Sequence, residues 1–90
     1  MSIGSVVKFE LINKASSLRD ASDREAASML ESFADQVDAV SKVARENNTV
    51  DLMMNTISDH FDLIAENYSV DTLRSVADFL DSMFTRLLNS

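Results

Sequence analysis

The chain contains no cysteine and no proline, and its only glycine is Gly4. Without cysteine there can be no disulfide framework, no thiolate zinc site and no cysteine nucleophile. Without proline and with a single glycine, the turns must be formed by other residues, of which asparagine is the best suited. No apolar run approaches the roughly 18 residues of a membrane-spanning helix, and the first residues do not resemble a secretion signal. We therefore expect a cytoplasmic protein that has no membrane partner.

Basic residues are scarce. Eight Lys and Arg stand against fifteen Asp and Glu, which gives a formal net charge of −7. Because affinity for nucleic acid rests mainly on Lys and Arg, we expect no direct binding of DNA or RNA. Basic proteins are better candidate partners, although the same charge can simply keep a small domain soluble.

The spacing of the carboxylates suggests an alternative function. Carboxylates three or four residues apart on a helix, such as Glu31, Asp35 and Asp38, are about 5 to 6 Å apart, which is near the spacing of phosphates. A protein with such a stripe can mimic a nucleic acid and occupy a basic site on a DNA- or RNA-binding protein. Basic residues that interleave with the acids count against this alternative; they are Lys42, Arg45, Arg74 and Arg86.

What the sequence does contain is a hydrophobic spacing that alternates steps of four and three residues. This spacing is typical of helices that pack nearly side by side. It occurs twice, as Ala26, Leu30, Phe33, Val37, Val40 and Ala44, and as Val50, Met54, Ile57, Phe61, Ile64 and Tyr68. We predict one all-α domain over residues 1–90, a bundle of three long helices and a short N-terminal helix, with antiparallel neighbours joined by tight Asn/Ser/Thr turns.

Capping residues set the predicted helix boundaries at approximately 5–18, 23–46, 50–66 and 70–88. Ser22 to Glu25 fits a capping box, in which the Ser22 side chain accepts a hydrogen bond from the Glu25 amide. Asn47 and Asn48 can close that helix in the left-handed conformation, and Thr49 can start the next. Asn67 and Ser69 repeat the same stop and start. Both places also match the N-glycosylation pattern, for which capping is the simpler explanation.

The segment 3–18 is ambiguous. As a helix it brings Val7, Leu11 and Ala15 to one side, but Lys8 interrupts that side. As a strand, Val7, Phe9 and Leu11 alternate with polar residues at period two. We favour the helix, because a single strand in a helical chain would lack a partner unless a second copy or another protein supplied one.

Some apolar residues exceed the needs of a simple core. Apolar side chains fill about half of the circumference of the last helix, and Leu52 and Leu63 fall opposite the main stripe of their own helix, with Thr56 between them. These residues predict a protein-interaction surface, whose candidate members are Leu52, Thr56, Leu63, Phe79, Phe84 and Leu88.

Helix length and small residues favour a homodimer. A helix from Asp23 to Arg45 would be about 35 Å long, whereas a compact domain of this size is about 31 Å across. Ala27, Ala34 and Ser41, seven residues apart, would let another helix approach closely. A symmetric dimer, the commonest oligomer, explains both features, and an elongated monomeric bundle is the alternative.

No set of residues predicts chemistry. His60 is the only histidine and has no second ligand at a metal-binding spacing. As a phosphotransfer histidine it would be flanked by Asp59 and Asp62, which would repel a phosphoryl group. The carboxylates are expected on solvent faces, Glu31, Asp35 and Asp38 on one helix and Asp51, Asp62 and Glu66 on the next, rather than in a cleft that would shift their pKa.

We therefore predict no catalytic residue, metal or cofactor. The expected function is that of a small, non-enzymatic protein-binding module, a regulator, inhibitor or assembly factor of bacterial or phage type, that binds itself, another protein or both. A nucleic-acid mimic is the first alternative, and a histidine phosphotransfer domain is the second.

Overall fold

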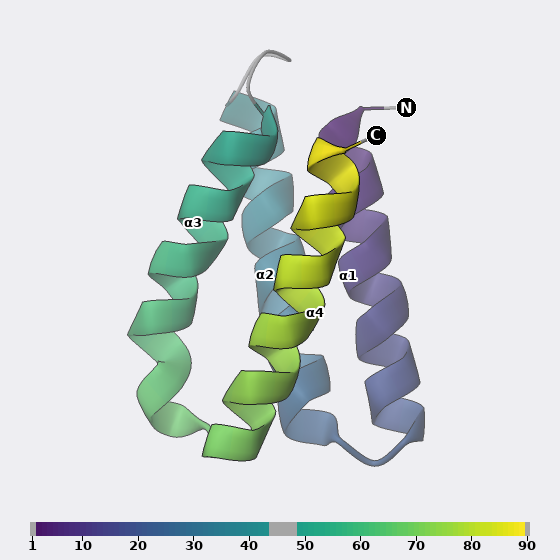
Figure 1. Ribbon diagram of the computed structural model, residues 1–90, viewed down its shortest axis with the longest axis vertical. Helices are drawn as coiled ribbons and strands as arrows, with labels where there is room; N and C mark the ends of the chain where they lie inside the picture. The colour runs from purple at the N-terminus through teal and green to yellow at the C-terminus, as the bar shows by residue number, and fades with distance from the viewer. Residues whose placement is uncertain (1, 44–48, 90) are drawn as a thin grey trace.

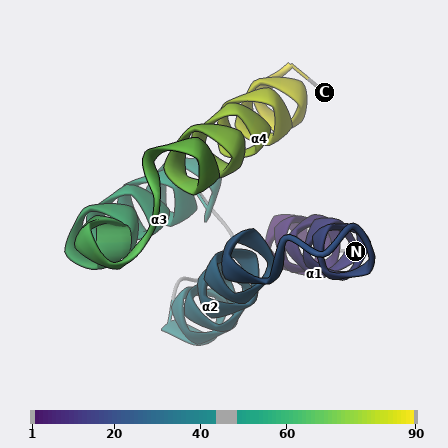
Figure 2. The same ribbon diagram turned by 90° about the horizontal axis from the view of Figure 1, so that it is seen from below.

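The computed structural model describes residues 2–43 and 49–89 and is all-helical over them. Its helices are α1 (Ile3–Asp20), α2 (Arg24–Val43), α3 (Thr49–Ile64) and α4 (Val70–Leu88), with a short 3₁₀ turn, η1 (Ala65–Asn67), after α3. They run alternately up and down the long axis of the molecule (Figure 1). Seen from below, α1 and α2 form one layer, and α3 and α4 form a second layer against it (Figure 2). The predicted all-α fold is confirmed.

The N-terminal helix α1 is longer than the short helix predicted over 5–18. It spans 18 residues, and Ser2 caps it by accepting a hydrogen bond from the Ser5 amide at 3.2 Å. The strand alternative is wrong. Lys8, which seemed to interrupt the apolar side, lies at the edge of that side and extends its ammonium to Asp38 of α2 at 3.3 Å. The charged side chain therefore leaves the apolar face of α1 free to pack.

The start of α2 corrects the predicted capping box. The cap is Asp23 rather than Ser22, because the Asp23 carboxylate accepts a hydrogen bond from the Ala26 amide at 3.3 Å. Ser22 instead has a φ of 69° and makes the reversal between α1 and α2. A serine takes this left-handed position because the sequence offers no glycine there. The predicted end of α2 near 46, at Arg45, Asn47 and Asn48, lies outside the described residues.

The connection from α3 to α4 confirms one predicted cap and corrects another. Ser69 caps α4 by accepting a hydrogen bond from the Thr72 amide at 3.2 Å. Helix α3, predicted over 50–66, begins at Thr49 and ends at Ile64, after which the chain tightens into η1. Asn67 does not close the helix in the left-handed conformation. Within residues 2–43 and 49–89, Ser22 is the one non-glycine residue with a positive φ.

Helix α2 is the centre of the molecule and packs against α1, α3 and α4. Its buried face contains Ala26, Leu30, Phe33 and Val37 of the predicted spacing, while Val40 is half-buried. From α3 the buried residues are Val50, Met53 and Ile57, whereas Met54 of the predicted spacing is half-buried. The helices align with a long axis of 35 Å in a molecule of 35 × 24 × 22 Å. The described part of α2 therefore does not overhang the domain.

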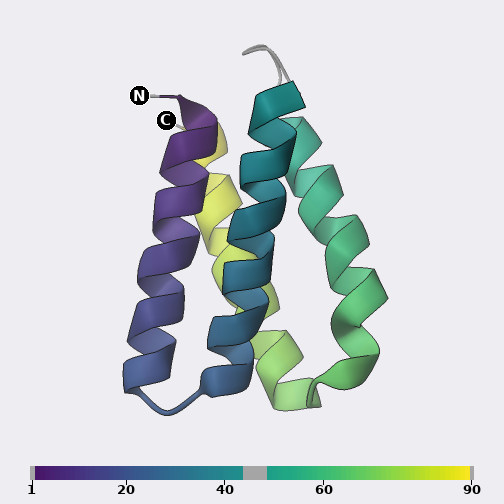
Figure 3. The same cartoon turned by 180° about the vertical axis from the view of Figure 1, so that it is seen from behind.

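Helix α1 lies beside α2 of the same chain (Figure 3), and Ser41 of the small-residue stripe faces Gly4 of α1. A Cβ added at Gly4 would collide with the Ser41 hydroxyl and approach the Met53 methyl group to 2.9 Å. Ala27 and Ala34, at the same heptad position as Ser41, are buried. The stripe that favoured a second copy is thus explained within one chain, and homodimerisation stays a prediction.

Candidate functional site

The residues predicted to form an interaction surface are distributed over several sides of the bundle. Leu52 is 44% exposed and lies in a shallow apolar depression with Ala39, Val40 and Val43 of α2. Thr56 is half-buried and donates its hydroxyl hydrogen to the Leu52 carbonyl at 2.8 Å. Leu63 is 78% exposed, the most exposed of the predicted set.

The three predicted residues of α4 separate into two environments. Phe79 is half-buried, and the Lys14 ammonium of α1 lies 5.6 Å from its ring centre. Phe84 and Leu88 instead face α3, where Phe84 is 6% exposed and Leu88 is 55% exposed. The structure therefore brings together only Phe84 and Leu88 of the predicted surface.

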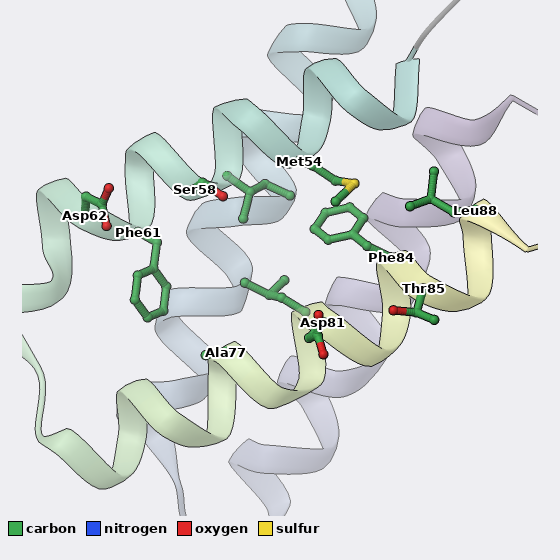
Figure 4. Close-up of a pocket in the computed structure, with 11 residues that line it drawn as sticks. Met54, Ser58, Phe61, Asp62, Ala77, Asp81, Phe84, Thr85 and Leu88 are labelled. Carbon is green, nitrogen blue, oxygen red and sulfur yellow. The ribbon is translucent and has the colours of Figure 1, made fainter.

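These two residues belong to a groove of about 290 Å³ between α3 and α4. Its deepest residues are Ile57, Leu80 and Phe84, which are almost fully buried. Half-buried Met54 and Phe61 form the wall on the α3 side. Figure 4 shows the Met54 thioether beside the Phe84 ring, with the Phe61 ring further along the groove. The groove is thus apolar at its floor and on its α3 wall.

Exposed residues form the rim of the groove. Ser58 and Asp62 line it from α3, and Asp81 and Thr85 line it from α4 (Figure 4). Ala77 and Leu88 lie at opposite ends of the α4 wall and are also exposed. Each wall therefore contributes one hydroxyl group and one carboxylate beside an apolar floor.

Charge is distributed unequally between the two layers. Residues 2–43 carry seven acidic and five basic side chains, a net −2, whereas residues 49–89 carry seven acidic and two basic, a net −5. Helices α1 and α2 are joined by Lys8–Asp38 and Arg19–Glu31 ion pairs, and Lys42 also pairs with Asp38. No carboxylate of residues 49–89 forms an ion pair with any residue that the structure describes.

His60 of α3 contacts two residues of α2. His60 Nε2 lies 2.7 Å from the Ser32 hydroxyl of α2, and its ring meets the Phe33 ring edge-on at 5.6 Å. These contacts join α3 to α2 at the boundary of the core, on the side of α3 away from the groove. Within 2–43 and 49–89, no group of three or more His, Asp or Glu residues could hold a metal ion.

Most predicted solvent-facing carboxylates are exposed, and one has a shifted pKa. The Lys8 ammonium, and after it Lys42, hold the pKa of the Asp38 carboxyl below its ordinary value of 3.8 by hydrogen bonding to the ionised form. Asp38 is at the surface, far from the groove, so this shift reflects ion pairing. In the described part of the chain, no helix is both long enough and apolar enough to cross a membrane.

The sequence interpretation missed the groove because it treated two kinds of residue as ordinary core or solvent face. Met54 and Phe61 were assigned to the core stripe, and Asp62 to the solvent face. A helical projection does place Ser58 and Asp62 beside that stripe, but only the separation of α3 from α4 makes these residues line one groove. The interpretation also missed Phe9, which is 62% exposed on the outer face of α1.

Comparison of the chain with models of protein families, with curated proteins and with solved structures finds no significant match. Function is therefore inferred from the groove itself. Its relevant properties are an apolar floor, exposed ends and carboxylates that have no ionic partner among residues 2–43 and 49–89.

Proposed function

We propose that this protein is a small, acidic, non-enzymatic interaction module that binds another protein through the α3–α4 groove. Regulation, inhibition or assembly of that partner are the roles that binding alone can perform. The observation that carries the proposal is the groove of about 290 Å³ with a floor of Ile57, Leu80 and Phe84. Open apolar surface with a polar rim marks interaction sites more often than it marks ordinary protein surface.

The side chains of the groove suit a protein partner. Met54 is flexible and polarisable, so it can adapt its shape to an inserted side chain. Phe61 offers a large apolar surface that is only half-buried in the free protein. Burial of aromatic and methionine side chains of this kind supplies much of the affinity at protein interfaces.

A nucleic-acid mimic is less well supported. Such a protein would act through its carboxylates alone, and the apolar floor between Asp62 and Asp81 would have no role. On α1 and α2, Glu31 and Asp38 are engaged by Arg19, Lys8 and Lys42. These intramolecular pairs reduce the negative potential that a basic site would recognise.

Photo-crosslinking in the native host tests the proposal. Benzoylphenylalanine is placed at Leu88, in the groove, and in a second variant at Leu63, which is exposed but outside it. We expect one discrete adduct from position 88 that contains a second protein. The adduct should diminish when Ala77→Trp obstructs the end of the groove opposite Leu88, because Ala77 is exposed on the α4 wall and the larger side chain competes with a partner that spans the groove.

Two results would contradict the groove as the binding site. One is an adduct at position 63 with none at position 88, which would move the interface to the outer face of α3. The other is an adduct at position 88 that Ala77→Trp leaves unchanged. The melting temperature of each variant is measured first, so that loss of an adduct is not caused by loss of the fold.

A further inference from the structure

We infer that the partner segment is an amphipathic helix of about three turns whose apolar face is flanked by Lys or Arg. This inference rests on the proposed function and specifies the chemistry of the occupant. It follows from the length of the groove, from the hydrogen bonding of its walls and from the charges along its rim.

The length of the groove matches a short helix. On the α4 wall it extends from Ala77 to Leu88, which at 1.5 Å per residue is about 16 Å. On the α3 wall it extends from Met54 to Asp62, about 12 Å. Three helical turns measure about 16 Å, and their apolar residues at i, i+3 or i+4, and i+7 would lie in a single row over Ile57, Leu80 and Phe84.

The walls favour a helix over an extended segment. Both walls are α-helices, whose backbone amides and carbonyls are already hydrogen-bonded within α3 and α4. An extended peptide would find no free sheet edge to pair with, and its own backbone groups would lose water without replacement. A helical partner satisfies its backbone internally and needs to match only side chains.

The rim favours basic flanks. Asp62 on α3 and Asp81 on α4 place a carboxylate on each wall, and neither has an ionic partner in the described structure. A helix seated between the walls would therefore meet negative charge on both flanks.

The two basic residues of α4 do not cancel this charge. Arg86 is bound to Glu10 of α1 at 2.9 Å, on the side of α4 away from the groove. Arg74 precedes Ala77 by three residues and so lies beyond the end of the groove, towards the connection with α3. The partner's basic residues are thus expected level with Asp62 and Asp81, not at the Arg74 end.

Charge also disfavours a second copy of this chain as the occupant. Each α3–α4 layer carries a net −5, so two such layers brought together would repel each other. A partner whose charge complements the groove must be positively charged. A basic helix from a different protein meets that requirement.

Three synthetic peptides of fourteen residues serve as probes. The first is an amphipathic Leu/Lys helix, the second carries Glu in place of every Lys, and the third is a scrambled Leu/Lys sequence without an apolar face. Each is titrated into the ¹⁵N-labelled full-length protein at low ionic strength. We expect saturable shifts of the Met54, Ser58, Asp81 and Leu88 amides with the first peptide, and affinities at least tenfold weaker with the other two.

Two pairs of variants locate the binding. Leu88→Asp should weaken the Leu/Lys peptide about tenfold, whereas Leu63→Asp, with the same change of charge outside the groove, should leave it unchanged. Asp62→Lys with Asp81→Lys should weaken it by a similar factor, whereas Asp20→Lys with Asp35→Lys, two exposed carboxylates of α1 and α2, should have little effect. Raising the salt concentration should reduce the difference between the last two variants.

The outcomes separate this inference from the proposed function. Two results would overturn the basic helix but leave the groove as a protein site. One is that the Glu peptide binds with the same affinity as the Leu/Lys peptide. The other is that the groove and the control charge reversals lower the affinity equally. Absence of groove shifts at about 1 mM of any peptide, together with an adduct at position 88, also overturns only the partner class. Absence of both shifts and adduct overturns the inference and the proposed function together.

Discussion

The two layers of this bundle contain helices of similar length but pack in different ways. In the α1–α2 layer, Gly4 lets α1 approach Ser41 of α2 closely, and Val7, Leu11, Ala27 and Ala34 are buried. In the α3–α4 layer, large residues such as Met54, Phe61 and Phe84 hold the helices apart and leave a groove. Small residues at facing positions close a helix pair, whereas large residues on both faces separate it when the ends are joined by a short connection.

The two layers also differ in charge. The closely packed layer is nearly balanced and ion-paired, while the open layer has a net −5 and, among the described residues, no ion pair of its own carboxylates. Three of the seven carboxylates of residues 2–43 form ion pairs, whereas none of the seven in residues 49–89 does so with a described residue. This contrast is the reason that we propose α3 and α4 as the binding layer.

The largest expected effect compares a leucine in each layer. Leu11→Ala should lower the free energy of unfolding by about 2 to 5 kcal/mol, because Leu11 of α1 is fully buried and its truncation leaves a cavity. Leu88→Ala, in the groove, should lower it by less than about 0.5 kcal/mol. Chemical denaturation followed by circular dichroism measures both. Similar losses would mean that the two layers do not differ in packing as the structure indicates.

A smaller effect is expected from the close approach of α1 to α2. Gly4→Ala should lower the free energy of unfolding by about 1 to 2 kcal/mol, because the new Cβ collides with Ser41. Ser41→Gly removes the colliding atoms, so the double variant should recover part of the loss although glycine itself weakens α2. A double-mutant cycle by denaturant unfolding gives the coupling. Strict additivity of the two losses would show that Gly4 and Ser41 are not in contact.

The smallest effect concerns the ion pairs of the α1–α2 layer. Asp38 should titrate below 3.8, because Lys8 and Lys42 stabilise its ionised form. A carboxyl whose pKa is lower in the folded state contributes stability that is present above its unfolded pKa and is lost as the pH falls through its folded pKa. The contribution of Asp38 is therefore fully present at neutral pH, and it declines as the pH falls below about 3.8 towards the lower pKa of the folded state.

Carbon-detected NMR titration of the Asp38 carboxyl checks this assignment. Lys8→Met should raise the pKa of Asp38, and so should Lys42→Met. Arg24→Met is a suitable control, because Arg24 is exposed and has no ion pair with Asp38. A pKa of Asp38 that neither lysine substitution moves would show that the ion pairs are not formed in solution.

The sequence predicted the helices well where local signals were decisive. Ser69 caps α4 as expected, and the spacing from Ala26 to Val37 forms the buried face of α2. It failed at the first reversal, where Asp23 rather than Ser22 caps α2 and Ser22 has a positive φ. Both residues are competent caps, so the choice depended on how α1 and α2 pack against each other. Helix α1 also extends two residues beyond the predicted 5–18 at each end, from Ile3 to Asp20.

The candidate site was predicted only in part. Phe84 and Leu88 do share the groove, but Leu52, Leu63 and Phe79 lie elsewhere. A helical projection gives the direction of each side chain around its own axis but not the distance to the next helix. Without that distance, Asp62 and Asp81 are two unrelated solvent carboxylates.

The sequence by itself therefore determined the helical class, most of the buried stripes and the excess of negative charge, because periodicity, capping and composition are local properties of the chain. Only the tertiary structure decided that Ser41 of α2 faces Gly4 of α1, that α3 and α4 stand apart, and that an acidic rim borders an apolar groove. These features depend on the distances between the helices, which are set by side chains from distant parts of the sequence. No local signal encodes those distances.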